Sequence, residues 1–168
     1  MREELDNRLC ADFPHLFVRR HVADSRMNAG FCCGDGWYTL IHGLCRSLQH
    51  RIDHHGEPQL HVIQVKEKLG QLRFYVDCPE GEITNAQHAV IEMAELLSGA
   101  TCEECGCPGR RVSNGGWLSV RCRLHEPEGS VSLEEAMAAK NERRAQRQAV
   151  WQDQAPWLLP EETKDDDA

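Results

Sequence analysis

The sequence predicts an α+β fold: an antiparallel hairpin packed with two or three helices, followed by a cysteine-rich module and a C-terminal helix. Three patterns lead to this prediction. Short runs alternate apolar and polar residues, longer segments repeat apolar residues every three or four positions, and four cysteine and histidine residues form two spaced pairs. The expected segments are an α+β domain at 1–100, the module at 101–127, a helix at 128–152 and a disordered acidic tail at 153–168.

Two helices are expected before the hairpin. The first covers residues 2–11, where two leucines lie one turn apart. The second runs over residues 37–52, with Asp35 as its N-cap. Its apolar residues recur at steps of three and four: Tyr38, Ile41, Cys45, Leu48 and Ile52.

The hairpin is expected from residues 60–65 and 71–77, because apolar residues alternate strictly along the second of these runs. Residues 66–70 form the connecting turn. The two lysines of this turn are either solvated or available to an acidic partner.

A third helix is expected at 84–98. Thr84 and Gln87 form a capping box at its start, and Gly99 is a suitable stop. One apolar stripe runs along this helix: Ile83, Ala86, Val90, Met93 and Leu97.

The module contains two ligand pairs, each with a two-residue gap, and 16 residues separate the pairs. Three thiolates and one imidazole at this spacing are typical of a tetrahedral Zn²⁺ site. The sequence therefore predicts a zinc site formed by Cys102, Cys105, Cys122 and His125. Because the protein supplies all four ligands, the ion is expected to hold structure together and not to catalyse. The alternative is a set of reduced cysteines beside a surface histidine.

Two details of the module stay open. Cys107 lies two residues after Cys105 and is able to replace one of the ligands. A treble clef would carry the second ligand pair on a helix, but a Glu-Pro-Glu-Gly segment interrupts the chain after His125. Treble-clef and zinc-ribbon-like modules are therefore both compatible with the sequence.

Two surfaces are candidates for binding a partner. The net charge is −8, and a net acidic chain is a poor non-specific ligand for nucleic acid. Basic residues nevertheless share one face of the last helix, which suits phosphates, an acidic protein surface or solvent: Lys140, Arg143, Arg144 and Arg147. An apolar cluster near the C-terminus is able to dock into a groove on another protein, or to fold back and hold this helix against the core: Trp157, Leu158 and Leu159.

Two patterns suggest catalysis, and each has a simpler explanation. Asp53-His54-His55 is similar to part of a metal-dependent nuclease motif, but the other residues of that motif are missing, which favours a solvated helix end. Cys32-Cys33 is able to form a nucleophile or a second metal site with a histidine. Convergence of these cysteines with His54 in one cleft would favour a small hydrolase.

Several motifs occur in a fixed order: GDGWYTLI at 34–41, VKEKLGQLRFYV at 65–76, TCEECG at 101–106, Gly116-Trp117 and Cys122-x-x-His125. This series resembles a family of small zinc-binding proteins of phages and prophages, over about residues 30–126. The resemblance implies an accessory protein of a mobile element and brings no catalytic residues with it.

The leading functional hypothesis is a non-enzymatic, zinc-stabilised accessory protein that acts through contacts with a host protein complex, such as an anti-CRISPR-like inhibitor of host defence. The alternative is a nucleic-acid-binding zinc module that uses the basic C-terminal helix, and a small hydrolase or nuclease comes third. The sequence has no signal-peptide pattern and no long apolar stretch, so a cytoplasmic location without membrane contact is expected.

Overall fold

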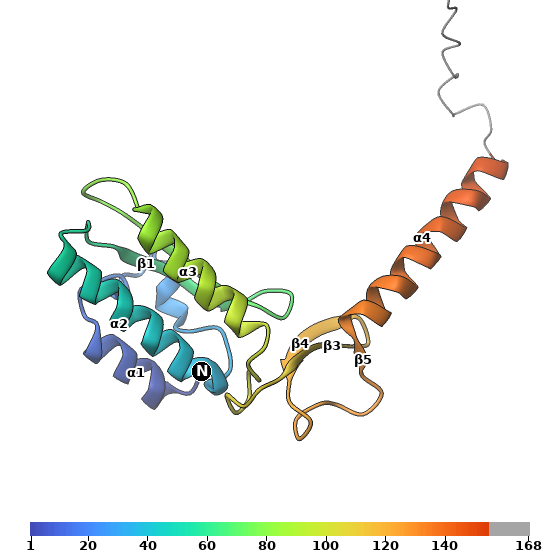
Figure 1. Cartoon of the computed structure of the whole chain (residues 1–168), viewed down its shortest axis with the longest axis horizontal. Coiled ribbons are helices and arrows are strands. Elements are labelled where there is room, and N and C mark those ends of the chain that lie inside the picture. Colours follow the sequence, from blue (N-terminus) through green and yellow to red (C-terminus); the bar gives the residue numbers. More distant parts are fainter. Residues whose placement is uncertain (155–168) are drawn as a thin grey trace, which may run out of the picture. The chain divides into compact units, whose positions relative to one another are not determined.

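The computed structural model describes residues 1–154 and confirms the α+β fold (Figure 1). Two antiparallel sheets contain two and three strands. The chain forms two compact units, and the second begins at Leu133. The segments expected at 1–100 and 101–127 therefore lie in one unit.

The predictions for the end of the chain fall outside the described residues. They concern the apolar cluster of Trp157, Leu158 and Leu159 and nearly all of the acidic tail at 153–168.

Three helices and a hairpin enclose the core of the first unit. They are α1 (Glu3–Asp12), α2 (Tyr38–His55), β1 (His61–Glu67), β2 (Leu72–Asp77) and α3 (Asn85–Ser98). Helix α3 packs against both α2 and β2 (Figure 1). Fully buried side chains come from several of these elements and from the segments between them: Leu9, Trp37, Ile41, Leu48, Val62, Val65 and Leu72.

Helix α2 has the expected apolar periodicity, but the predicted N-cap is wrong. Asp35 starts a short 3₁₀ helix, η2 (Asp35–Trp37), and Trp37 holds the cap position without a side-chain hydrogen bond. The Asp35 carboxylate instead accepts hydrogen bonds from the backbone N–H and from Nε of Arg2, at 2.7 and 2.6 Å. This carboxylate joins the start of the chain to the turn before α2.

Helix α3 begins with the predicted capping box. Thr84 Oγ1 accepts a hydrogen bond from the N–H of Gln87, and Gln87 Oε1 accepts one from the N–H of Thr84, both at 3.1 Å. The side-chain amide of Gln87 also donates to the carbonyl of Pro58 at 2.9 Å. Gln87 is fully buried, so its three hydrogen bonds fix which face of α3 points inward.

The predicted apolar stripe of α3 is wrong in part. Met93 and Leu97 are 57% and 49% exposed, and Leu96 between them is 59% exposed. The buried residues are instead Gln87, Ile91, Ala94 and Ser98. Helix α3 therefore carries apolar residues on its outer face as well as on its inner face.

A buried ion pair joins α1 to the loop that follows it. The carboxylate of Asp6, which is 5% exposed, accepts hydrogen bonds from Nε and Nη2 of Arg20 at 2.8 and 3.2 Å. It also accepts one from the backbone N–H of Phe31 at 3.2 Å. One carboxylate thus connects three segments of the chain.

Asp6→Asn is expected to lower the free energy of unfolding by about 2 kcal/mol, because the Arg20 guanidinium loses its charged partner in a buried site. Urea unfolding measures the change. Asp24→Asn is the matched control, since Asp24 is exposed and forms no ion pair among the described residues. Equal stability of the two variants would contradict the role given to Asp6.

The metal module, residues 101–127, contains a hairpin of β3 (Arg110–Asn114) and β4 (Trp117–Arg121). A third strand, β5 (Val131–Ser132), pairs with β3, so the strand order is β4-β3-β5. Cys122 and His125 follow β4 in a turn and not on a helix. Of the two expected module types, the structure therefore agrees with the ribbon-like one.

The second unit, taken by itself, is represented by helix α4 (Leu133–Gln154). The predicted C-terminal helix is confirmed, and within the segment expected at 128–152 it starts at Leu133. All side chains from 137 to 151 are exposed. Helix α4 therefore buries no apolar stripe over these residues.

Candidate metal centre

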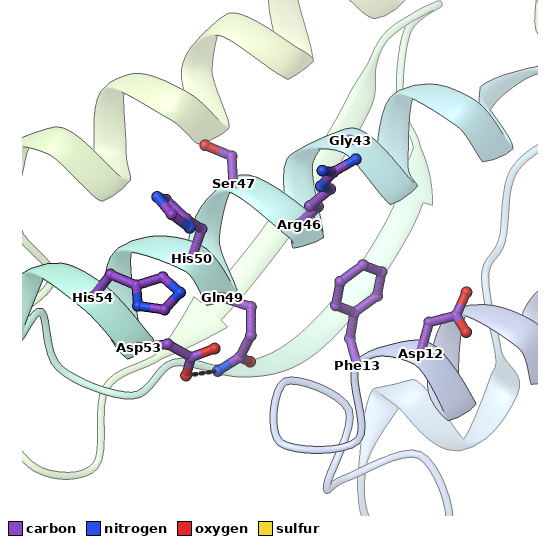
Figure 2. A pocket seen from close by; sticks show the side chains of 9 residues that line it. All are labelled: Asp12, Phe13, Gly43, Arg46, Ser47, Gln49, His50, Asp53 and His54. Carbon is purple, nitrogen blue, oxygen red and sulfur yellow. Dashed lines mark hydrogen bonds between the residues drawn. The ribbon is translucent and has the colours of Figure 1, made fainter.

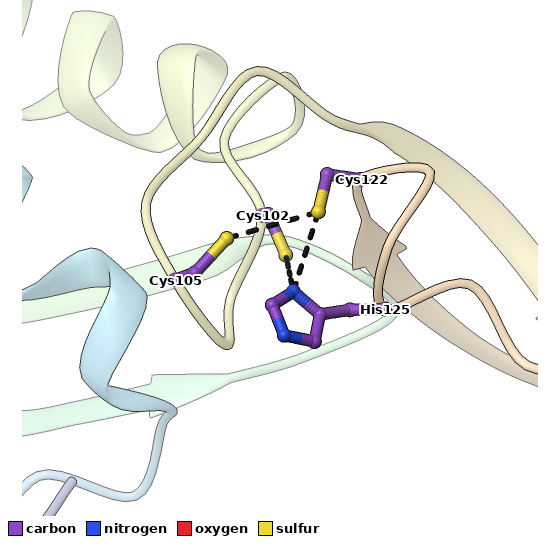
Figure 3. A group of neighbouring side chains, drawn as sticks. All are labelled: Cys102, Cys105, Cys122 and His125. Atoms are coloured by element: carbon purple, nitrogen blue, oxygen red, sulfur yellow. Dashed lines mark hydrogen bonds between the residues drawn. The ribbon is translucent and has the colours of Figure 1, made fainter.

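Cys102, Cys105, Cys122 and His125 point toward one another, and their ligand atoms all lie within 4.8 Å of each other (Figure 3). The sulfurs of Cys105 and Cys122 are 3.7 Å apart. Nδ1 of His125 lies 3.7 Å from the sulfur of Cys102 and 3.3 Å from that of Cys122. These four side chains can hold a metal ion, and no other group of this kind occurs among the described residues.

Two tight turns position the ligands. In the first, the N–H of Gly106 donates to the carbonyl of Cys102 at 2.8 Å, and Gly106 has a φ of +76° that favours glycine. In the second, the N–H of His125 donates to the carbonyl of Cys122 at 3.0 Å. The β3–β4 hairpin brings the two turns together, as the spacing of the ligand pairs predicts.

Backbone dipoles favour the ionised form of one of the three thiols, whereas the pKa values of the other two, Cys105 and Cys122, are raised. Burial by itself would raise the pKa of the Cys102 thiol. Hydrogen bonds from the backbone N–H groups of Cys122, Cys105 and Glu104 outweigh this effect and lower the pKa to about 6. Burial raises the pKa of the Cys122 thiol. Three thiolates this close repel one another, so a bound cation is needed to keep all of them ionised.

The first ligand turn, which contains Cys102 and Cys105, packs against the turn before α2. The backbone N–H of Gly36 donates to the carbonyl of Glu103 at 2.8 Å, and the N–H of Gly34 donates to the Glu103 carboxylate at 3.0 Å. A Cβ on Gly36 would lie 2.2 Å from the carbonyl oxygen of Cys102. Two glycines are therefore needed for this approach, and the Gly-Asp-Gly motif is the seat of the metal module.

Two further contacts join the ligand turns to the rest of the fold. The indole Nε1 of Trp37, which is fully buried, donates to the carbonyl of Thr101 at 2.8 Å. Glu103 Oε2 lies 3.3 Å from Nη1 of Arg121 and so ties the first turn to β4. The sequence analysis did not predict this contact. Gly34 and Gly36, which are separated by one residue and precede Trp37, were a signal for a close backbone approach.

The remaining cysteines of interest lie away from the cluster. Cys107 is exposed, its thiol is not part of the ligand group, and its carbonyl accepts a hydrogen bond from the N–H of Cys102 at 2.8 Å. Cys32 is exposed and Cys33 is buried. Burial raises the pKa of the Cys33 thiol to about 12, which keeps it protonated at neutral pH. Neither of these two cysteines lines the pocket that contains His54.

That pocket, of about 560 Å³, lies between the end of α1 and the outer side of α2 (Figure 2). Asp53 accepts a hydrogen bond from Gln49 at 2.9 Å, and Asp12 lies 3.3 Å from the ring of His42. Figure 2 shows Asp12 well apart from Asp53 and His54. The rings of His50 and His54 are 4.6 Å apart, but no three of the possible ligands described around this pocket come close enough to share a metal ion, so this geometry lends no support to a metal-dependent nuclease.

Internal ion pairs occupy two of the arginines in the metal module. Arg110 binds Glu126 at 2.7 Å, and Arg121 binds Glu104 at 3.2 Å as well as Glu103. The four predicted cations of α4 are all exposed, and none forms an ion pair among the described residues: Lys140, Arg143, Arg144 and Arg147. Helix α4 therefore offers a partner four exposed cations that no ion pair within residues 1–154 occupies.

Comparison of the chain with protein-family models, curated proteins and solved structures found no match. The resemblance to small phage and prophage proteins stays a prediction. Within residues 1–154, no helix has both the length and the apolar character needed to cross a membrane.

Proposed function

We propose that this chain is a non-enzymatic, zinc-stabilised binding protein that acts through protein–protein contacts. The observation that carries the proposal is the exposure of α4. A helix in a globular protein gains most of its stability by packing an apolar face. Met137, Val150 and Trp151 of α4 are 54%, 55% and 50% exposed. A partner that covers this helix would supply the missing packing.

The ion in this proposal is Zn²⁺ with a structural role. In a tetrahedral site with Zn–S bonds of about 2.3 Å, neighbouring ligand atoms lie about 3.8 Å apart. The separation of 3.7 Å between the sulfurs of Cys105 and Cys122 supports this geometry. Thiolate and imidazole ligands suit Zn²⁺, whereas Mg²⁺ and Ca²⁺ prefer oxygen. Four protein ligands leave no position for water or substrate, which supports a role without catalysis.

The proposed partner is a host protein complex. The specific activity to test first is inhibition of a host defence complex, as an anti-CRISPR protein would do. The resemblance to phage proteins supports this setting. The net charge of −8 supports competition for a groove that normally binds nucleic acid.

A second candidate function is binding of nucleic acid through α4. The four basic residues of this helix lie at i, i+3, i+4 and i+7, so they share one face, and they are free of ion pairs among the described residues. Met137 and Trp151 lie on the same side of the helix, by the same spacing. A phosphate backbone and an acidic protein surface would both fit this face.

The double substitution Arg143→Glu/Arg144→Glu tests both candidates. In pull-downs from host lysate, the wild-type chain is expected to retain a specific protein complex that the variant loses. If nucleic acid is the ligand, the wild-type chain binds DNA or RNA at low salt, and the variant weakens that binding at least about tenfold, because both charges change sign.

Arg26→Glu/Arg46→Glu is the matched control, since it makes the same change in charge at two exposed arginines of the first unit. Fluorescence anisotropy over a salt series measures nucleic-acid binding. No binding at low salt excludes the second candidate. Recovery of the same host proteins by the wild type and the α4 variant would contradict the first.

A further inference from the structure

The outer face of α3 and the tip of the β1–β2 hairpin together carry four exposed, large apolar side chains. We call them the α3 patch: Leu69, Met93, Leu96 and Leu97, which are 63%, 57%, 59% and 49% exposed. Ala89 is also exposed, and with Met93 and Leu96 it follows the 4-3 spacing of a coiled-coil seam within α3. A helix that presents a seam of this kind toward solvent lacks a partner.

The hairpin tip and the end of α3 are neighbours. The N–H of Leu72, at the start of β2, donates to Oγ of Ser98 at 2.8 Å. The side chain of Arg111 lies next to both Gly70 and Gly99. Figure 1 shows the β1–β2 turn beside the C-terminal end of α3. Leu69 therefore extends the apolar seam of α3 beyond the end of the helix.

Leu69 is also strained. It is the one non-glycine residue with positive φ in residues 1–154, at +56°, and Gly70 follows at +70°. Lys68 and Gln71 exchange both backbone hydrogen bonds, so Leu69 and Gly70 are the two central residues of a tight hairpin turn. Asparagine or glycine suits the first of these positions, and leucine does not. A strained leucine that gains no burial within its own chain points to a contact with another molecule.

Charges on the two sides of the patch indicate that the molecule in contact with Leu69 is a second copy of this chain. Lys68 lies at the hairpin end of the patch, Glu92 lies at the opposite end in the middle of α3, and neither forms an ion pair among the described residues. A two-fold axis near Leu96 would align two copies of α3 antiparallel. Lys68 of one copy would then face Glu92 of the other, twice in each dimer.

We propose that the α3 patch is the interface of a homodimer, in which two copies of α3 pack antiparallel and Leu69 of each copy packs against the other. This inference does not rest on the proposed function, since it uses neither the metal site nor α4. A dimer would present two copies of α4 to a partner and so increase the apparent affinity for a target with repeated sites.

Analytical ultracentrifugation of the full chain over a concentration series tests the proposal. The wild type is expected to be dimeric at high micromolar concentration and to dissociate on dilution. Leu96→Glu is expected to be monomeric throughout. Val22→Glu, at an exposed residue outside the patch, makes the same change in charge and is expected to stay dimeric. Circular dichroism and metal content show whether each variant is folded.

A charge exchange tests the antiparallel arrangement. Lys68→Glu is expected to raise the dissociation constant of the dimer about tenfold, since two attractive pairs become repulsive. Lys68→Glu/Glu92→Lys is expected to restore it. A wild-type monomer at every concentration, or a Leu96→Glu variant that is still dimeric, overturns the interface. Failure of the double exchange to restore the dimer overturns the antiparallel pairing.

Discussion

Replacing Cys102 with serine is expected to abolish stoichiometric zinc binding and to unfold the metal module. A serine hydroxyl is a much weaker ligand for Zn²⁺ than a thiolate, and Cys102 is the fully buried ligand of the four. A structural zinc ion contributes on the order of 10 kcal/mol to folding. Typical domains are stable by only about 5–15 kcal/mol, so loss of the ion removes most of that stability.

The loss is expected to spread into the helical core. The metal module and the core form one compact unit and share the hydrogen bond from the buried Trp37 indole to Thr101. When the ligand turn opens, this indole loses its acceptor and the backbone of Gly36 loses its partner on Glu103. Near-ultraviolet circular dichroism of the tryptophans should therefore change together with the loss of metal.

Cys107→Ser is the matched control for this experiment. It makes the same chemical change at an exposed cysteine two residues from Cys105, outside the ligand group. Metal content by mass spectrometry and thermal unfolding, with and without a strong chelator, give the two readouts. Full zinc content in the Cys102 variant, or unchanged melting of the wild type after chelation, would contradict a structural zinc site.

Local patterns made much of the fold predictable. Alternation marked β2, the capping residues Thr84 and Gln87 marked the start of α3, and paired spacing marked the four ligands. Each of these signals acts over a few residues. They can therefore be recognised in a single sequence, without knowledge of which segments meet in space.

The orientation of α3 was not predictable in this way, because apolar residues lie on both of its faces. Periodicity favoured a stripe that includes Met93 and Leu97. The core instead receives Gln87, whose buried amide has partners at Pro58 and Thr84 that only the tertiary fold supplies. A polar residue that is satisfied by distant backbone groups is invisible to a hydrophobic pattern.

The seat of the metal module was missed for a related reason. Gly34 and Gly36 read as a turn before a helix, and that reading is correct but incomplete. Their neighbours across the contact are backbone atoms of Glu103 and Cys102, nearly 70 residues later in the chain. The metal ligands were visible in the sequence, whereas the surface that holds them in place was not.

Gly36→Ala tests this seat directly and is expected to destabilise the protein by about 3 kcal/mol. Its Cβ would lie 2.2 Å from the Cys102 carbonyl oxygen and 2.6 Å from the backbone nitrogen of Cys105. Backbone atoms of the turn that carries two of the candidate metal ligands cannot move aside as a flexible side chain can. The first ligand pair must shift, so zinc affinity is expected to fall together with stability.

Gly43→Ala is the control, because an added Cβ there meets nothing within 4 Å and the residue lies inside α2. This change is expected to stabilise the protein by up to about 1 kcal/mol, since alanine favours a helix interior over glycine. Urea unfolding and competition with a zinc chelator measure both variants. If Gly36→Ala kept full stability and zinc affinity, the motif would be an ordinary turn. Opposite signs for two Gly→Ala changes seven residues apart would show that residue 36 must be glycine because of its contact with the turn at Cys102–Gly106, and not because of helix α2 that follows it.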